Sequence, residues 1–284
     1  MNTNQRARHL RLPEATAEDE AGAADRQFVA ALGRGLDILR CFDEGDAELG
    51  NQDFVQRTGL PKATVSRLTY TLARLGFLTY VERSGRYTIG AGVVALARTM
   101  LNNLDIRQLA RPQMLELAER FGAVCCMAAR DRNHIVFIEM ARSSSAITLS
   151  TDVGSRVPIE STALGRAYLA VMPADERTAL LADLKQARGK DWPAAKAAIA
   201  QGQEQFRRQG FVVSLQSWQR DVNAVAVPLV MPNGSGIYSF MCGGPSFLIK
   251  QAALENEIGP ALRQMVYRLE VGIGGRRGVH RLRD

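Results

Sequence analysis

The side chains that most often carry catalysis or bind metals are sparse in this sequence of 284 residues. Of three histidines, only His134 lies in a part of the chain that we expect to be folded. No C-x-x-C pair, H-E-x-x-H, G-x-S-x-G or Walker motif is present. We expect reduced core thiols at the four cysteines, which are Cys41, Cys125, Cys126 and Cys242. The sequence therefore predicts no catalytic residue, no metal site and no cofactor, and it argues against an enzyme.

Basic side chains are the remaining candidates for chemistry, and their distribution is uneven. From Arg57 to Arg86 there are six bases and one acid, whereas Asp43 to Asp53 contains five acids and no base. A small module with one acidic and one basic side suits contact with phosphates. Two ordinary solvated faces would give the same counts. The net charge of +7 permits a nucleic-acid partner.

Residues 61–75 form the candidate DNA-reading helix. A helical wheel gathers Val65, Leu68, Leu72 and Leu75 into one buried stripe. The opposite side and the helix start lack acids and carry groups that bind base edges or phosphates. Among them, Arg67 has two donors suited to guanine. The predicted DNA-contacting residues of this helix are Lys62, Ala63, Thr64, Ser66, Arg67, Tyr70 and Arg74.

Two further helices must position that face. Residues 28–42 place Val29, Leu32, Leu36, Leu39 and Phe42 at helical spacing. Asn51 is the expected N-cap of a short second helix over 52–57, which Gly59 would end. Pro61 suits the first position of the third helix, and Gly76 would end that helix. Helix, short helix, tight turn and helix make the helix-turn-helix pattern.

A hairpin follows directly. Residues 78–81 and 87–89 are strand-like and are joined by residues 82–86. This arrangement places Arg83 and Arg86 at the tip of a wing, where they would meet the DNA backbone or minor groove. The segment is thus predicted to be a winged helix-turn-helix.

The rest of the chain alternates helices and strands. A helix over 92–103 is predicted to be a linker whose broad apolar surface packs either on a second subunit or on its own chain. Hairpin-linked strands mixed with helices predict an α+β fold with a mostly antiparallel sheet. The predicted helices are 106–121, 163–171, 174–187, 193–209 and 250–270. The predicted strands are 124–129, 135–140, 147–150, 211–215, 222–230 and 237–241.

Several stretches carry a family resemblance. Residues 31–39 (ALGRGLDIL) and 58–68 (TGLPKATVSRL) resemble the IclR family of bacterial transcription regulators. Residues 75–78 and 87–90 are similar to the two ends of its wing. Residues 157–170, 226–229 and 243–245 resemble its second half. The resemblance spans roughly residues 28–269 in order and spacing.

The resemblance implies a ligand-responsive transcription regulator, repressor or activator, that controls a catabolic operon. It implies a GAF-like effector-binding domain for small organic acids or aromatic compounds. It also implies a homodimer or dimer of dimers on a palindromic operator of double-stranded DNA. A winged-helix protein-interaction module without sequence-specific DNA binding is the alternative. The lack of large aliphatic side chains on the outward face of helix 61–75 favours DNA.

The resemblance also assigns the effector-binding residues, which are Leu149, Val157, Ala163, Leu164, Ser214, Ala224, Met241 and Gly243. Here the chain departs from the family. Ser214 and Ala224 stand where many members have an acidic residue and a cysteine, and Met241 and Gly243 replace paired serines that hold a carboxylate. Either another group, for instance Arg130, binds the carboxylate, or the effector is larger and more apolar. Met241 and Trp218 favour a flat apolar body, although plain core packing would also explain them.

These observations give the expected organisation of the chain. It comprises a disordered arm (1–27), a winged helix-turn-helix DNA-binding domain (28–90), a linker helix (91–104), an effector-binding domain (105–272) and a flexible basic tail (273–284). No apolar run reaches the roughly 18 residues of a membrane span, and residues 1–27 lack a signal-peptide core. We therefore expect a cytoplasmic protein without a membrane partner.

Overall fold

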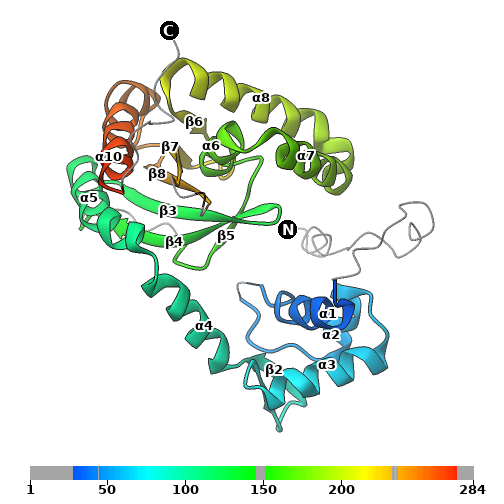
Figure 1. Ribbon diagram of the computed structural model, residues 1–284. Helices are drawn as coiled ribbons and strands as arrows, with labels where there is room; N and C mark the ends of the chain where they lie inside the picture. Colours follow the sequence, from blue (N-terminus) through cyan, green and yellow to red (C-terminus); the bar gives the residue numbers. More distant parts are fainter. Residues whose placement is uncertain (1–27, 44, 145–150, 232–233, 235, 274–284) are drawn as a thin grey trace. The chain divides into compact units, whose positions relative to one another are not determined.

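The computed structural model describes residues 28–43, 45–144, 151–231, 234 and 236–273 (Figure 1). The chain divides into two compact units, the first ending at Asn103 and the second beginning at Leu104. Each unit has its own buried apolar core. They are therefore described separately.

The N-terminal unit is a winged helix-turn-helix, as predicted. Its elements are α1 (Ala30–Leu39), α2 (Asn51–Thr58), α3 (Lys62–Arg74), β1 (Leu78–Val81), β2 (Arg86–Ile89) and α4 (Ala91–Asn102). β1 and β2 pair antiparallel, with Leu78 opposite Ile89. Ile38, Phe54 and Val65, one from each of the first three helices, are fully buried and hold these helices together.

The start of α2 differs from the prediction. Its N-cap is Gly50 rather than Asn51, because the Asp53 carboxylate accepts a hydrogen bond from the Gly50 N–H at 2.8 Å. Asn51 is the first helical residue, and its side-chain oxygen accepts from the Thr69 hydroxyl of α3 at 3.2 Å. Pro61 likewise precedes α3 as its N-cap instead of opening it.

The predicted buried stripe of α3 is wrong at one end. Val65 and Leu72 are buried and Leu68 is half-buried, but Leu75 is 63% exposed. The helix ends at Arg74 and the chain turns at Gly76, whose φ is +77°, so the helical wheel no longer places Leu75. Thr69 is fully buried instead, and its hydroxyl donates to the Val65 carbonyl at 3.0 Å.

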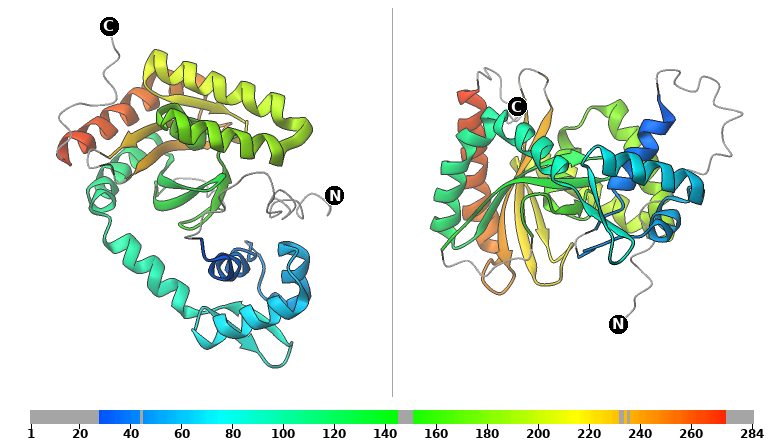
Figure 2. Two further views of the ribbon diagram at one scale, coloured as in Figure 1. Left: turned by 45° about the vertical axis from the view of Figure 1, so that its right-hand side comes forward. Right: turned by 90° about the horizontal axis from the view of Figure 1, so that it is seen from below.

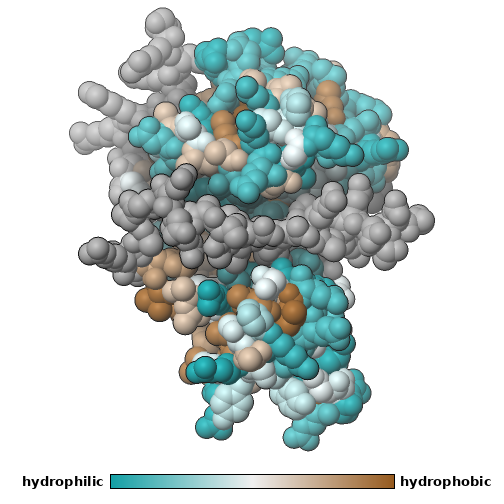
Figure 3. Space-filling model, turned by 90° about the vertical axis from the view of Figure 1, so that its right-hand side faces the viewer, coloured by the Kyte–Doolittle hydropathy of each residue, from teal (hydrophilic) through white to brown (hydrophobic). Residues whose placement is uncertain are grey.

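The apolar residues spaced as a helix over 28–42 only partly face the core: Leu39 and Phe42 pack against it, but the others do not. Val29, Leu32 and Leu36 are 63%, 64% and 49% exposed. The helix instead buries Gly35 and Ile38 against the rest of the unit. In Figure 3 the N-terminal unit, in the lower half of the view, carries brown hydrophobic side chains at its surface.

The C-terminal unit is an α+β fold with an antiparallel sheet, which confirms the predicted class. Its strands are β3 (Val124–Asp131), β4 (His134–Arg142), β5 (Arg156–Pro158), β6 (Val212–Leu215), β7 (Val222–Val230) and β8 (Ile237–Pro245). Its helices are α5 (Asp105–Phe121), α6 (Ala163–Val171), α7 (Ala174–Arg188), α8 (Trp192–Gln209), α9 (Gln251–Ala253) and α10 (Gly259–Gly272). A π-helical turn, Leu254–Ile258, joins the last two helices.

In the described ranges, the sheet has six strands in the order β5-β4-β3-β8-β7-β6. Every neighbouring pair is antiparallel. α5 and α10 cover one face, and α6, backed by α8, covers the other (Figures 1 and 2). This three-layer arrangement leaves the sheet face under α6 as the place where a buried cavity can form.

One predicted strand is untested, and one observed strand was not predicted, in the region after β4. The predicted strand 147–150 lies outside the described residues, as do the predicted arm 1–27 and residues 274–284 of the tail. β5 was not predicted, because three residues are too few to show an alternating pattern.

A β-bulge in β4 sets which of its side chains face the cavity. Met127 lies opposite Glu139 and Ala128 lies opposite Phe137, so Ile138 is an extra residue in β4. The bulge reverses the alternation of the strand. Phe137 and Met140 therefore share one face although they are three residues apart, and Glu139 points to the other.

Candidate functional sites

The face of α3 predicted to contact DNA lies at the surface. Tyr70 is 65% exposed, and Thr64 is half-buried. The other predicted contacts of this helix are exposed, namely Lys62, Ala63, Ser66, Arg67 and Arg74. Within the described part of the chain, its three cationic side chains form no ion pair, so they are available to bind phosphates or base edges.

The two arginines predicted at the wing tip differ in their surroundings. The Arg83 side chain is 86% exposed, with Glu48 at 3.8 Å. Arg86 lies in β2 rather than in the loop. Its Nη2 binds the Asp53 carboxylate at 2.6 Å and the Glu48 carbonyl at 3.1 Å. Arg86 thus ties the wing to the start of α2, and its contact with DNA stays a prediction.

An ion pair also fixes the chain that leads into α2. The Arg57 guanidinium binds the Asp46 carboxylate and the Cys41 carbonyl. The hydrogen bond with Asp46 holds the pKa of Arg57 above its usual value. Burial raises the pKa of the Cys41 thiol to about 12, so this side chain is a neutral thiol at pH 7. All four cysteines are free and buried.

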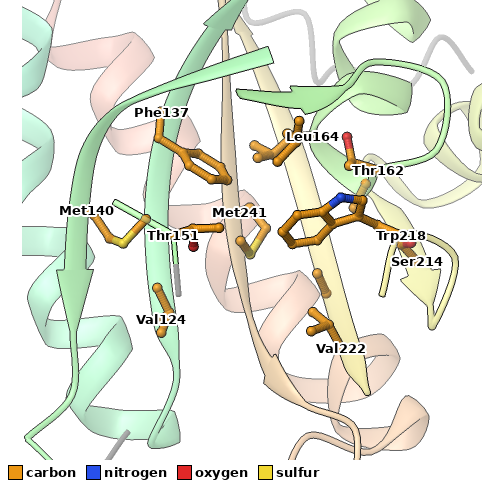
Figure 4. Close-up of a pocket in the computed structure, with 13 residues that line it drawn as sticks. Val124, Phe137, Met140, Thr151, Thr162, Leu164, Ser214, Trp218, Val222 and Met241 are labelled. Atoms are coloured by element: carbon orange, nitrogen blue, oxygen red, sulfur yellow. The ribbon is translucent and has the colours of Figure 1, made fainter. Parts of the chain in front are cut away.

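A cavity of about 520 Å³, counting its opening to solvent, lies in the C-terminal unit between the sheet and the start of α6. Its walls are mostly apolar. The lining residues are Val124, Phe137, Met140, Thr151, Val157, Thr162, Ala163, Leu164, Ser214, Trp218, Val222, Ala224 and Met241. Figure 4 shows the side chains of Phe137, Leu164, Trp218 and Met241 converging on its centre.

The structure brings together most of the residues predicted to bind an effector. Six of them line the cavity, namely Val157, Ala163, Leu164, Ser214, Ala224 and Met241. Leu149 lies outside the described residues. Gly243 is not a lining residue, but it lies between Val124 and Ala224 in the sheet. A Cβ there would meet the Ala224 Cβ at 2.8 Å and the Asn223 carbonyl oxygen at 2.5 Å, so close strand packing requires glycine.

Seven lining residues were not among the predicted contacts. Phe137 and Met140 share the cavity face only because of the bulge at Ile138. Val124 lies opposite Gly243 in the β3–β8 pair. Trp218, noted for its flat ring, lies in the loop before β7. A wide aromatic and aliphatic lining suits a flat apolar ligand.

The polar groups of the cavity are few. The Thr162 hydroxyl caps α6, accepting from the Gly165 N–H at 3.1 Å and donating to the Pro158 carbonyl at 3.0 Å. Ser214 is buried and lines the wall under β6. Arg130, considered for a carboxylate, is not a lining residue. Its guanidinium lies 3.7 Å from Glu176 and over the Tyr168 ring.

The opposite face of the sheet holds a buried carboxylate. The Glu139 side chain is 2% exposed and binds Arg107 at 2.6 Å and Arg111 at 2.5 Å, both on α5. It also accepts from the Met140 N–H at 3.1 Å. Because Met140 lines the cavity, one short segment of β4 contacts both the cavity and α5.

Comparison with known protein families assigns both units of the chain. The family described as IclR helix-turn-helix domain matches residues 31–82. The family described as bacterial transcriptional regulator IclR, C-terminal, matches residues 98–269. The chain belongs to the IclR family. It is therefore a helix-turn-helix transcription regulator with a C-terminal effector domain.

Individual relatives support this assignment over nearly the whole chain. The HTH-type transcriptional regulator TsaQ1/TsaQ2 of Comamonas testosteroni is 38% identical over 262 residues, 92% of each chain. The crystal structure of an IclR family transcriptional regulator from Brucella abortus is 42% identical, with a TM-score of 0.84 over 89% of this chain and 95% of that one. These relatives are transcription regulators by name.

A more distant structure shares the fold alone. It is an IclR homolog from Microbacterium hydrocarbonoxydans complexed with 4-hydroxybenzoate, 22% identical with a TM-score of 0.60, covering 86% of this chain and 97% of that one. Among the described residues, no helix is long and apolar enough to cross a membrane. The same residues contain no cluster of three or more potential metal ligands.

Proposed function

We propose that this IclR-family regulator controls a catabolic operon in the bacterial cytoplasm and responds to a small organic acid or aromatic metabolite. The observation that carries the proposal is the cavity of about 520 Å³ under α6, walled by aromatic and aliphatic side chains. The same chain presents an exposed basic helix. One polypeptide thus combines an apolar cavity with an exposed basic helix suited to reading DNA.

On the DNA side, α3 enters the major groove. Arg67 binds a guanine through two donors, and the short side chains around it contact base edges or phosphates. Arg74 and Lys62, at the two ends of the helix, bind the backbone. Arg83 contacts the backbone or minor groove from the wing.

On the effector side, the cavity favours a flat body. Trp218, Phe137 and Met241 offer ring and thioether surface, which binds aromatic ligands through dispersion and burial. The homolog complexed with 4-hydroxybenzoate supports an aromatic acid as the effector class. We propose that the effector also contacts the six predicted residues that line the cavity, which are Val157, Ala163, Leu164, Ser214, Ala224 and Met241.

We expect a homodimer or dimer of dimers. α1 and its N-cap Val29 expose apolar side chains, with Leu32 and Leu36 on the helix, and α4 exposes Val94 and Leu96 at 65% and 61%. Two apolar helix faces on one small unit favour burial against a second copy. A two-fold pair of α3 helices then requires a palindromic operator with half-sites about one helical turn apart, or a multiple of it.

Filling of the cavity is proposed to shift a two-state equilibrium that alters DNA affinity. The route begins at Met140, which lines the cavity, and passes to Glu139, which binds two arginines of α5. α5 follows α4 after two residues, Asn103 and Leu104. Displacement of β4 would thus reach the helix that follows the DNA-binding elements.

The test is a binding titration of the purified protein with the DNA upstream of its own gene, across salt concentrations and with random duplex as competitor. We expect tight, competitor-resistant binding with a steep salt dependence. A saturating aromatic acid should change that affinity or the DNA bend.

The protein could bind neither the upstream DNA nor an operator obtained by selection more tightly than it binds random duplex. That result would favour the protein-interaction module instead. If no organic acid tested changed the operator affinity, the DNA bend or the recruitment of polymerase, the sensing role would be contradicted. The DNA-binding role would remain in place.

A further inference from the structure

A carboxylate bound in this cavity needs a cation, because an unpaired charge is costly to bury in apolar surroundings. None of the described lining residues supplies one. The sheet register, however, places arginines next to lining residues at two positions of the described chain, Arg142 and Arg156. Which of them faces the cavity follows from the pairing of the strands.

Arg142 lies beside three lining residues. It is directly opposite Val124 in the β3–β4 pair and two residues beyond Met140, so it shares their face of the sheet. Its Nη2 donates to the carbonyl of Thr151, which also lines the cavity. Burial raises the pKa of Cys126, the residue opposite Met140, and the positive charge of Arg142 partly offsets this rise. These relations place the guanidinium at the end of the cavity formed by Val124, Met140 and Thr151, three residues labelled in Figure 4.

The guanidinium is incompletely bound there. Its Nε is buried and has no hydrogen-bond partner in the described part of the chain. The anion paired with it among the described residues is loosely held, since Asp152 is 77% exposed and lies 3.7 Å from Nη1. A buried donor without a partner carries a desolvation cost that an incoming acceptor would remove.

Arg156 and Arg130, two other arginines near the cavity, are engaged elsewhere. Arg156 adjoins Val157 in β5 and so points to the opposite face, where it binds Asp131 at 3.1 Å. Arg130 lies near Glu176 and over the Tyr168 ring. Neither is positioned to reach a ligand between Val124 and Met241.

We propose that Arg142 is the anion-binding residue of the effector cavity. It binds the carboxylate of a ligand whose flat apolar body lies against Phe137, Met241 and Trp218. Nε and one Nη present a planar pair of donors, which matches the two oxygens of a carboxylate. The inference rests on the proposed sensing function and assigns the chemical class of its ligand: an aromatic or other planar monoanion.

The test compares two pairs of probes that differ in charge and hardly in shape: benzoate with benzamide, and 2-naphthoate with 2-naphthamide. Their affinities for the full-length protein and for Arg142→Gln are measured by calorimetry. We expect the wild type to prefer each carboxylate, and Arg142→Gln to lose about tenfold to a hundredfold in carboxylate affinity while amide affinity stays unchanged. Arg142→Lys should restore part of the preference, and added salt should reduce it in the wild type.

Arg130→Gln is the matched control, because Arg130 and Arg142 have similar side-chain exposures of 27% and 31%. It should leave both affinities unchanged. Equal losses for carboxylate and amide in Arg142→Gln would mean that Arg142 only supports the wall near Thr151, and would overturn the proposal. Binding of the amides with no preference for the carboxylates in the wild type would also overturn it, yet leave the sensing function intact. Binding of neither member of either pair would contradict both.

Discussion

The N-terminal unit leaves Lys62, Arg67 and Arg74 exposed along α3, whereas the C-terminal unit engages Arg107 and Arg111 with one buried carboxylate. The two sets of cations differ in whether the described part of the chain supplies them with an anion. Those of α3 form no ion pair within the described residues, so they are available to an external anion. Those of α5 share one carboxylate, that of Glu139, whose side chain is 2% exposed.

The difference shows why the net charge of +7 says little by itself about function. Exposed cations on α3 keep their hydration and lose it only when phosphates replace water. Arg107 and Arg111 stabilise a carboxylate that burial would otherwise make unfavourable. We therefore expect substitutions in the second set to alter folding, and substitutions in the first set to alter DNA binding.

The largest effect is expected at Glu139. Glu139→Gln removes the negative charge that two arginines share and should destabilise the C-terminal unit by about 3 kcal/mol. This is the lower end for breaking a buried ion pair, because Arg111 is 63% exposed. The free energy of unfolding in urea measures it, followed by far-ultraviolet circular dichroism.

Arg111→Gln is the matched control for that experiment. It removes the more exposed partner and should cost no more than about 1 kcal/mol, as surface ion pairs do. Operator affinity of the folded Glu139→Gln protein should be near wild type without effector, with a weaker response to effector. An unchanged free energy of unfolding would show that Glu139, Arg107 and Arg111 contribute no net stability to the C-terminal unit. That result would contradict the structural role expected of the arginines of α5.

An intermediate effect is expected at Arg67. Arg67→Ala should weaken operator binding by about 2 kcal/mol, because in the proposed complex the side chain makes one bidentate contact with a base. The melting temperature should stay unchanged, because the side chain is exposed. Competition between operator and random duplex measures the specific part of the loss. An equal loss on both DNAs would reassign Arg67 to a phosphate contact.

Arg86→Ala provides the contrast within the same unit. Its guanidinium binds Asp53 at 2.6 Å and the Glu48 carbonyl, so we expect a lower melting temperature besides any effect on DNA. A variant with wild-type stability and weak DNA binding would instead show that Arg86 contacts DNA, as the sequence pattern suggested.

The two sites also differ in how far the sequence predicts them. The DNA-reading face depends on one helix, and a period of 3.6 residues is enough to place Arg67 and Tyr70 outside and Val65 inside. The prediction failed where the helix ended, at Leu75. Thr69 was missed because its hydroxyl is satisfied by the helix backbone, which no apolar pattern reveals.

The cavity depends on contacts between distant parts of the chain. The residues assigned from family resemblance line it where the strands alternate regularly, as at Ser214 and Ala224. Phe137 and Met140 were missed because an unpredictable bulge at Ile138 reverses the alternation of β4. A one-residue change of register exchanges the two faces of a strand, and single-sequence patterns do not fix it.

The smallest effect is expected at Glu119, a carboxylate held by neutral partners instead of arginines. The backbone N–H of Ser144 and the hydroxyls of Ser143 and Ser144 donate to it, and the Ser144 N–H contributes most to lowering its pKa below the ordinary value of 4.5. A lowered pKa in the folded state stabilises the protein above about pH 4.5. That contribution is lost as the pH falls through the folded-state pKa. Glu119→Gln should therefore melt slightly below the wild type at pH 7, and this difference should narrow as the pH falls below 4.5, measured by calorimetry. A difference in melting temperature that does not narrow at low pH would mean that Glu119 acts through shape rather than charge. Glu139 would then be the one of these two carboxylates whose charge matters to folding.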